Sequence, residues 1–290
     1  MRQKLLIWSL LILLLAGCES PGNKRPIPPS YQESRKNFKT NLLVQGEAPQ
    51  FYEEFDATLG SIKAISFESG NFKLKALLDT TNIESGKRKP VVIYLHGGFS
   101  LGYSDMGNCQ PFIDAGYIVL APTYRGENGN EGNFELFMGE IDDAKAAIKW
   151  VSEQPFTDKE NIFVFGHSIG GAMSLMLSFH SDVLIKKSGS SSGIYDTATI
   201  DYWATEEKII PFDHRNPDEL YFRLPIFTLE YMKRPHYIYI GNEDGFEDYK
   251  NFQSELYPNG RTLLRISEVE GDHSTSLSNA MNEFIIEIKK

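Results

Sequence analysis

The sequence predicts one α/β domain with a mostly parallel, doubly wound sheet that opens with an antiparallel hairpin. Three observations support this fold class: two alternating segments near residue 70, five short apolar runs after them, and helical patterns between the runs. The 290 residues are 41% apolar and 23% charged. This length and composition are sufficient for one large hydrophobic core.

The hairpin is predicted from residues 62–67 and 72–78, which alternate between apolar and polar side chains. Ser69, Gly70 and Asn71 lie between the two segments and are typical turn residues. We therefore expect two neighbouring antiparallel strands at the start of the sheet.

Five short runs without alternation follow the hairpin, at residues 91–95, 117–121, 162–165, 237–240 and 263–266. Such runs are typical of strands that are buried on both faces of a parallel sheet. Segments 141–151, 172–179 and 281–288 place apolar residues on one helical face. This alternation of strands and helices predicts a doubly wound sheet.

Residues 189–235 fit neither pattern and carry eight aromatic side chains: Tyr195, Tyr202, Trp203, Phe212, Tyr221, Phe222, Phe227 and Tyr231. Two interpretations stay open. The segment forms either ordinary core helices or a cap that lines a substrate pocket.

The N-terminus has the features of an export signal. Arg2 and Lys4 precede an apolar run over residues 5–15, which is too short to span a bilayer comfortably. Leu15-Ala16-Gly17-Cys18 follows and resembles the bacterial lipobox, in which the cysteine is lipidated. The resemblance implies a signal peptide over 1–17, lipidation at Cys18, and an exported lipoprotein anchored in a membrane of the bacterial cell envelope. An uncleaved anchor and an ordinary secretory signal are the alternatives.

Residues 18–45 begin with a segment that contains four prolines and offers little to bury, and we expect a flexible tether there, with the folded domain over 46–290. Cys109 has no second cysteine to pair with if Cys18 is lipidated, so we expect a buried, reduced thiol. Loss of Arg2 and Lys4 with the signal changes the formal net charge from −10 to about −12. This acidic balance argues against a nucleic-acid partner.

The clearest chemical motif is Gly166-His167-Ser168-Ile169-Gly170-Gly171, which follows the apolar run 162–165 and precedes a segment with helical spacing. This strand-turn-helix setting is required for a nucleophile elbow, in which a strained turn exposes the serine hydroxyl. We predict Ser168 as a nucleophile.

A serine hydroxyl needs a base, and the base needs a carboxylate. His273 lies in the loop between the last predicted strand and the last helix, so we predict it as the base. Asp244 follows run 237–240 and is the favoured acid, with Glu243 and Asp248 as alternatives. The order serine, acid, histidine is that of the α/β-hydrolase fold.

Acyl transfer also requires hydrogen-bond donors for the developing oxyanion. The backbone N–H of Ile169 is one candidate. The loop His96-Gly97-Gly98-Phe99 follows run 91–95, and Gly98 or Phe99 would supply the second N–H. A plain glycine turn is the alternative.

Five segments together resemble the catalytic domain of the prolyl oligopeptidase family, and dienelactone-hydrolase-like esterases are similar. They are His96-Gly97-Gly98-Phe99, Tyr124-Arg125-Gly126, the Ser168 elbow, Gly241-Asn242-Glu243-Asp244 and Gly271-Asp272-His273. The resemblance covers residues from about 60 to 290. It implies a triad of Ser168, Asp244 and His273, and a structural or substrate-side role for Arg125.

Two departures from the family favour an esterase over an oligopeptidase. Fewer than 50 residues lie between Cys18 and the hairpin, too few for the β-propeller of the oligopeptidases. The tyrosine that donates to the oxyanion in some members is His96 here.

The sequence thus predicts a serine hydrolase for a small ester or a short peptide, with carboxylesterase favoured and peptidase as the alternative. A non-catalytic binding lipoprotein on a hydrolase fold is a further alternative. No cofactor is implied, and no metal-ligand spacing of His, Cys, Asp or Glu is present in the sequence.

Overall fold

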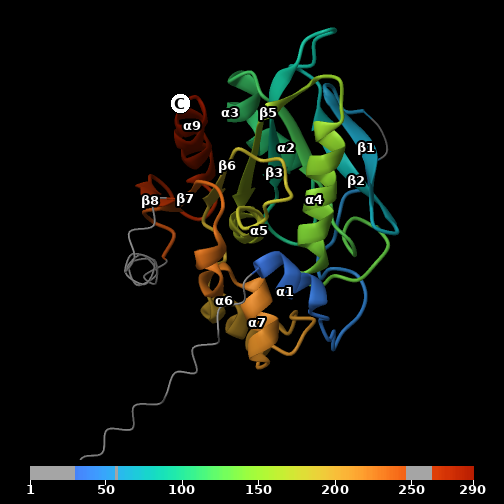
Figure 1. The fold of residues 1–290 in the computed structure, drawn as a ribbon, viewed down its shortest axis with the longest axis vertical. Coiled ribbons are helices and arrows are strands. Elements are labelled where there is room, and N and C mark those ends of the chain that lie inside the picture. Colours follow the sequence, from blue (N-terminus) through green and yellow to red (C-terminus); the bar gives the residue numbers. More distant parts are fainter. Residues whose placement is uncertain (1–29, 56–57, 246–262) are drawn as a thin grey trace, which may run out of the picture.

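The computed structural model describes residues 30–55, 58–245 and 263–290 (Figure 1). The predicted signal peptide (residues 1–17), Cys18 and Asp248 lie outside the described residues. In the part that is described, no helix is long and apolar enough to cross a membrane.

The centre of the molecule is an eight-stranded sheet in the order β1-β2-β4-β3-β5-β6-β7-β8 (Figure 1). Its strands are β1 (Ile62–Ser69), β2 (Phe72–Asp79), β3 (Lys89–Leu95), β4 (Ile118–Pro122), β5 (Thr157–His167), β6 (Lys187–Ser191), β7 (His236–Gly241) and β8 (Leu264–Val269). The pairs β1–β2 and β2–β4 are antiparallel and the others are parallel. The predicted hairpin and the mostly parallel sheet are confirmed.

Helices cover both faces of this sheet. They are α1 (Tyr31–Asn37), α2 (Tyr103–Asn108), α3 (Gln110–Asp114), α4 (Gly139–Ser152), α5 (Ile169–Leu177), α6 (Thr197–Tyr202), α7 (Pro217–Arg223) and α9 (Leu277–Ile288). Along β3, Val91, Ile93 and Leu95 pack toward α4 and α5, while Val92 and Tyr94 pack toward α2, α3 and α9. Because successive strand residues point to opposite faces, a strand between two helical layers is apolar throughout.

The sequence analysis missed β6, whose residues Lys187-Ser188-Gly189-Ser190-Ser191 contain no large apolar side chain. Hydrogen bonds replace apolar packing there. The buried ring of His236 lies 2.7 Å from Ser188 Oγ through Nδ1 and 2.8 Å from Ser190 Oγ through Nε2. Strand β6 ends at Ser191. The segment between strands therefore begins after Ser191, whereas the sequence analysis placed its start at Gly189.

Between β6 and β7 the chain forms α6, a π-helical turn (Trp203–Glu207), α7 and two 3₁₀ turns (Pro225–Phe227 and Leu229–Tyr231). Phe212, Phe222 and Tyr231 are buried in the main core, whereas Tyr202 and Phe227 are exposed. This segment therefore serves partly as core and partly as surface.

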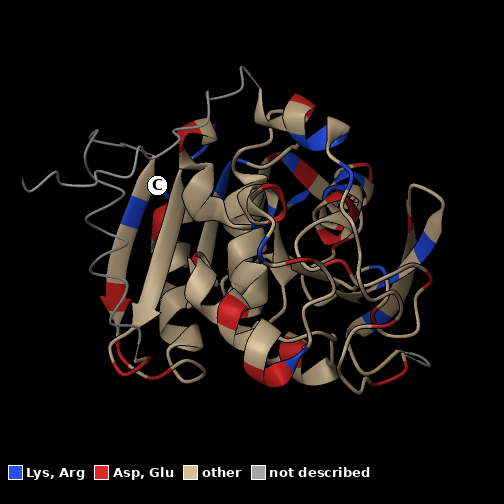
Figure 2. Cartoon of the chain, turned by 90° about the horizontal axis from the view of Figure 1, so that it is seen from below, with Lys and Arg blue, Asp and Glu red and all other residues tan. Residues whose placement is uncertain are grey.

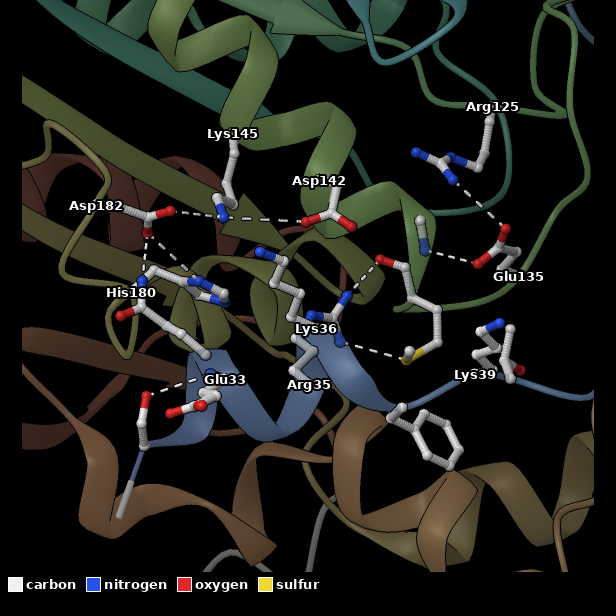
Figure 3. Close-up of a pocket in the computed structure, with 16 residues that line it drawn as sticks. Glu33, Arg35, Lys36, Lys39, Arg125, Glu135, Asp142, Lys145, His180 and Asp182 are labelled. Carbon is white, nitrogen blue, oxygen red and sulfur yellow. Dashed lines mark hydrogen bonds and ion pairs between the residues drawn. The ribbon is translucent and has the colours of Figure 1, made fainter. Parts of the chain in front are cut away.

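The predicted tether differs from the structure over residues 31–37, which form α1 and dock on the domain. Tyr31 is 2% exposed, and Arg35 is buried and donates hydrogen bonds to the carbonyls of Met138 and Phe222. Figure 3 shows Arg35 reaching from α1 into the pocket between α1 and α4. The proline-rich composition before residue 30 hid this short amphipathic helix.

Replacing Tyr31 with alanine is expected to lower the free energy of unfolding by about 3 kcal/mol, because a buried aromatic ring is removed. The ring packs against Phe179, His180 and Tyr231 at centroid distances of 5.5, 5.5 and 5.7 Å. Urea denaturation would measure the change. Lys36→Ala on the exposed face of the same helix is the control, and equal stability of the two variants would mean that α1 is not docked.

Figure 2 shows that basic and acidic residues are interspersed where α1 lies beside α4. Lys145 on α4, for example, pairs with Asp182 at 3.0 Å. The predicted burial of Cys109 is confirmed, since this residue between α2 and α3 is fully buried, and it forms no disulfide within the part of the chain that the structure describes.

Candidate active site

Ser168 lies at the turn between β5 and α5, with φ of 53° and ψ of −116°. A positive φ is uncommon for a residue with a side chain and costs of order 1–3 kcal/mol. The surrounding structure has to hold this conformation. The predicted strand-turn-helix geometry of the elbow is present.

The two glycines that flank the elbow are required by close backbone contacts. A Cβ atom on Gly166 would overlap the carbonyl of Gly170, and a Cβ atom on Gly170 would overlap the carbonyl of Leu95. No side chain fits at either position without movement of the backbone. The G-x-S-x-G spacing is therefore a steric consequence of the tight turn between β5, β3 and α5.

Backbone hydrogen bonds tie the elbow to its two neighbours in the sheet. The Ser168 N–H donates to the Ser191 carbonyl at the end of β6 (3.0 Å), and the Gly170 N–H donates to the His96 carbonyl after β3 (3.1 Å). These bonds fix Ser168 at the carboxyl edge of the sheet. In α/β sheets, this edge is where ligands bind.

Asp244 and His273 lie on the loops that follow the neighbouring parallel strands β7 and β8. His273 Nδ1 lies 3.0 Å from Asp244 Oδ1, and the Asp244 side chain is 2% exposed against 38% for His273. A carboxylate in this position accepts a hydrogen bond from Nδ1–H and so sets the tautomer of the neutral imidazole.

Of the alternative acids, Glu243 has an exposed side chain, and its backbone N–H donates to the Gly271 carbonyl at 3.0 Å. Asp248 lies outside the described residues. Asp244 is the acid that the structure brings to His273.

The predicted oxyanion loop packs directly on the elbow. A Cβ atom on Gly97 would lie 3.3 Å from Ser168 Cβ, and Gly98 has a φ of 71°. The Phe99 N–H donates to Gln50 Oε1 at 2.8 Å, a contact that the sequence did not predict. Ile169 is the first residue of α5, so its N–H points from the positive end of a helix.

His96 is buried beneath this loop, where Nε2 lies 3.2 Å from Glu127 Oε2 and the ring stacks on Tyr124. Burial disfavours the charged form, but the charge and the contact of Glu127, together with Asp105 and the Gly97 carbonyl, act in the opposite direction and raise the pKa of His96. The sequence analysis did not identify Glu127. Its position directly after Tyr124-Arg125-Gly126 was the available signal.

Arg125 has a structural position. Its guanidinium donates to both carboxylate oxygens of Asp143 on α4 (2.9 and 2.8 Å) and lies 3.5 Å from Glu135. Figure 3 shows Arg125 and Glu135 together at the rim of the pocket between α1 and α4. None of Ser168, Asp244 and His273 lines that pocket.

Aromatic rings lie beside the oxyanion loop. The Phe99 ring contacts Phe134 at 5.3 Å and Trp203 at 5.5 Å between centroids. Trp203 belongs to the segment between β6 and β7, so that segment reaches the candidate site. Within the described ranges, no group of three or more His, Cys, Asp or Glu side chains is placed to hold a metal ion.

The strand order and the elbow are those of the α/β-hydrolase fold, and the His273–Asp244 pair lies on the loops after the last two strands of its sheet. A family model of the prolyl oligopeptidase family matches residues 103–266, more than half of the chain. The protein belongs to the prolyl oligopeptidase family.

Individual relatives are more distant. An uncharacterized peptidase of Bacillus subtilis, YtmA, is 36% identical over 85 residues, which cover 29% of this chain and 33% of YtmA. The esterase Pf2001 of Pyrococcus furiosus has a TM-score of 0.62 at 18% identity, covering 83% of this chain and 96% of its own. Acylaminoacyl peptidase of Pyrococcus horikoshii has a TM-score of 0.59 at 20% identity, covering 79% and 40%.

The chain spans about a third of the length of YtmA. The two structural likenesses show the fold.

Proposed function

We propose that the protein is a serine hydrolase that cleaves an ester, with Ser168 as nucleophile, His273 as general base and Asp244 as the acid that orients the base. The His273–Asp244 hydrogen bond, at the sheet edge that presents Ser168 on a strained turn, carries this proposal.

The proposed reaction is two-step acyl transfer. With Nδ1–H donating to Asp244, the lone pair of the neutral His273 ring is on Nε2, which takes the Ser168 hydroxyl proton as Oγ attacks the carbonyl. His273 returns that proton to the leaving alcohol, and the acyl group stays on Ser168. Water, activated by His273, then releases the acid and restores the serine. No cofactor takes part in these steps.

The developing negative charge is proposed to be held by the Ile169 N–H and the Gly98 N–H. The Phe99 N–H already donates to the Gln50 side chain, and this hydrogen bond holds the oxyanion loop in place. An oxyanion donor is worth roughly 3–4 kcal/mol in hydrolases where it has been removed.

The aromatic rings of Phe99, Phe134 and Trp203 beside the oxyanion loop would favour an uncharged acyl group, and this supports an ester over a substrate with a charged peptide terminus. Peptidase activity on short peptides is the second candidate. It is supported by the prolyl oligopeptidase family match and by the similarity to YtmA.

A panel of matched substrates tests the choice of bond. For each acyl group, hydrolysis of the p-nitrophenyl ester and of the p-nitroanilide would be compared as acceleration over the uncatalysed reaction, since esters are intrinsically more reactive. We expect greater acceleration for esters with small or apolar acyl groups. Preferential acceleration of aminoacyl anilides would contradict the ester proposal in favour of the peptidase.

Replacing Gln50 with alanine is expected to lower kcat by about 2- to 10-fold, because an exposed hydrogen bond that braces the loop is worth about 0.5–1.5 kcal/mol. Steady-state kinetics would measure this, with exposed Gln45→Ala in the same segment as the control. A rise in kcat would instead mean that Gln50 competes with the substrate, and that Phe99 supplies the oxyanion donor.

We also propose that the protein is exported and anchored in a membrane of the bacterial cell envelope through lipidated Cys18. The support is the sequence of residues 1–18, since two or more acyl chains give stable anchoring. Labelled palmitate should enter the full chain expressed in a bacterium, which should partition into detergent. A Cys18→Ala chain that behaves identically would refute the anchor.

A further inference from the structure

His167 is the variable residue of the elbow and the last residue of β5, next to Ser168. The proposed reaction gives it no role, yet its ring is half-buried between two loops of the site. The two ring nitrogens of His167 can therefore form hydrogen bonds with these loops, close to Ser168.

The first contact of His167 is with the base itself. His167 Nε2 lies 2.8 Å from the backbone carbonyl of His273, and the two rings are 4.9 Å apart. A carbonyl oxygen only accepts hydrogen bonds, so Nε2 carries the proton and donates. The hydrogen bond joins the turn that carries the nucleophile to the residue that activates it.

The other side of the ring faces the oxyanion loop. A Cβ atom on Gly97 would lie 2.9 Å from His167 Nδ1, so only a glycine leaves room for the ring. His167 is thus wedged between the oxyanion loop and the base loop. A side chain in this position limits how far either loop can move.

The base loop is shaped by hydrogen bonds on both sides of His273. Gly271 N–H donates to Asn242 Oδ1 (3.0 Å), and Asp272 accepts hydrogen bonds from the Ser274 and Thr275 amides. These bonds set the turn itself. The bond from His167 to the His273 carbonyl does something different, because it ties the turn to the elbow in a neighbouring part of the sheet.

We propose that His167 is a positioning residue that fixes the His273 backbone, so that the imidazole keeps its contact with Asp244 while it faces Ser168. This inference rests on the proposed function. A misplacement of the base by about 1 Å can lower the reaction rate by about 100-fold. The single hydrogen bond from His167 can therefore have a large effect on the rate.

Burial lowers the pKa of His167; the hydrogen bond to the His273 carbonyl acts in the opposite direction, and the neighbouring His273 ring lowers the pKa further, so the neutral ring is favoured. The titratable groups that act on it are His273, Asp244 and Asp105. A neutral donor holds the carbonyl without adding a positive charge beside the imidazolium that forms on His273.

Two variants separate the donor from the bulk of the side chain. Gln places an amide N–H near the position of Nε2, whereas Met has similar length and no donor. We expect H167M to lower kcat for ester hydrolysis by about 10-fold with KM within about 2-fold, and H167Q to recover most of the loss. Thermal unfolding of both variants should match, which excludes a general loss of folding.

A second measurement does not depend on turnover. The low-field proton NMR resonance of the His273 Nδ1–H···Asp244 bond should persist in H167Q and broaden or disappear in H167M. Equal kcat in H167M and wild type, an equal loss in both variants, or an unchanged resonance in H167M would overturn the positioning role. Absence of turnover in wild type with the resonance behaving as expected would overturn the proposed function and leave the positioning role standing.

Discussion

Ser168→Ala is expected to lower kcat for ester hydrolysis by at least about 10⁴-fold, because the reaction loses its nucleophile while substrate binding and the oxyanion donors remain. The substitution removes only Oγ from a residue already held at a φ of 53°, so the fold should be retained. Steady-state kinetics on the best p-nitrophenyl ester would measure the loss.

Ser278→Ala is the matched control, since Ser278 is exposed on α9, far along the chain from the elbow. Its kcat should equal that of wild type. Residual turnover in Ser168→Ala close to that of the control would contradict the assignment of the nucleophile.

Asp244→Asn is expected to lower kcat by roughly 10³- to 10⁴-fold, since an amide that donates to Nδ1 places the imidazole in the wrong tautomer. The Asp244 side chain is almost fully buried and 3.0 Å from His273 Nδ1, so a substituted amide has little freedom to turn away. The measurement is kcat at neutral pH, with folding checked by circular dichroism.

Glu243→Gln makes the same chemical change one residue earlier, on an exposed side chain. It is expected to leave kcat within about 2-fold of wild type, as surface substitutions usually do. A greater loss in Glu243→Gln than in Asp244→Asn would assign the acid to Glu243 instead.

The strands that are buried between two layers of helices were predictable from the sequence, because the side chains in their buried runs are apolar. Runs 91–95 and 162–165 contain no charged or small polar residue and lie within β3 and β5. Strand β6 was not predictable in this way, because Ser188 and Ser190 satisfy their buried hydroxyls through His236, and no periodicity encodes that partner. Helix α1 was missed because its buried face consists of only Tyr31 and Arg35.

In the candidate site too, the features that local sequence determines were predictable, and those that depend on tertiary structure were not. The elbow is predictable because local sterics demand its glycines, and the order of Ser168, Asp244 and His273 follows from the topology. The choice between Glu243 and Asp244 depends on the exact turn after β7, which is a tertiary property. Gln50 lies 49 residues before Phe99 in the chain, and no sequence pattern links them.

Fluorophosphonate labelling of the full chain, with the adduct located by peptide mass spectrometry, tests the central claim most directly. A fluorophosphonate reacts with a serine hydroxyl only where a base and an oxyanion site activate it. We predict a single adduct on the peptide that contains Ser168, lost in Ser168→Ala and strongly reduced in His273→Ala. A folded wild-type protein that does not label, or that labels on another serine, would contradict the account and favour a binding protein on a hydrolase fold.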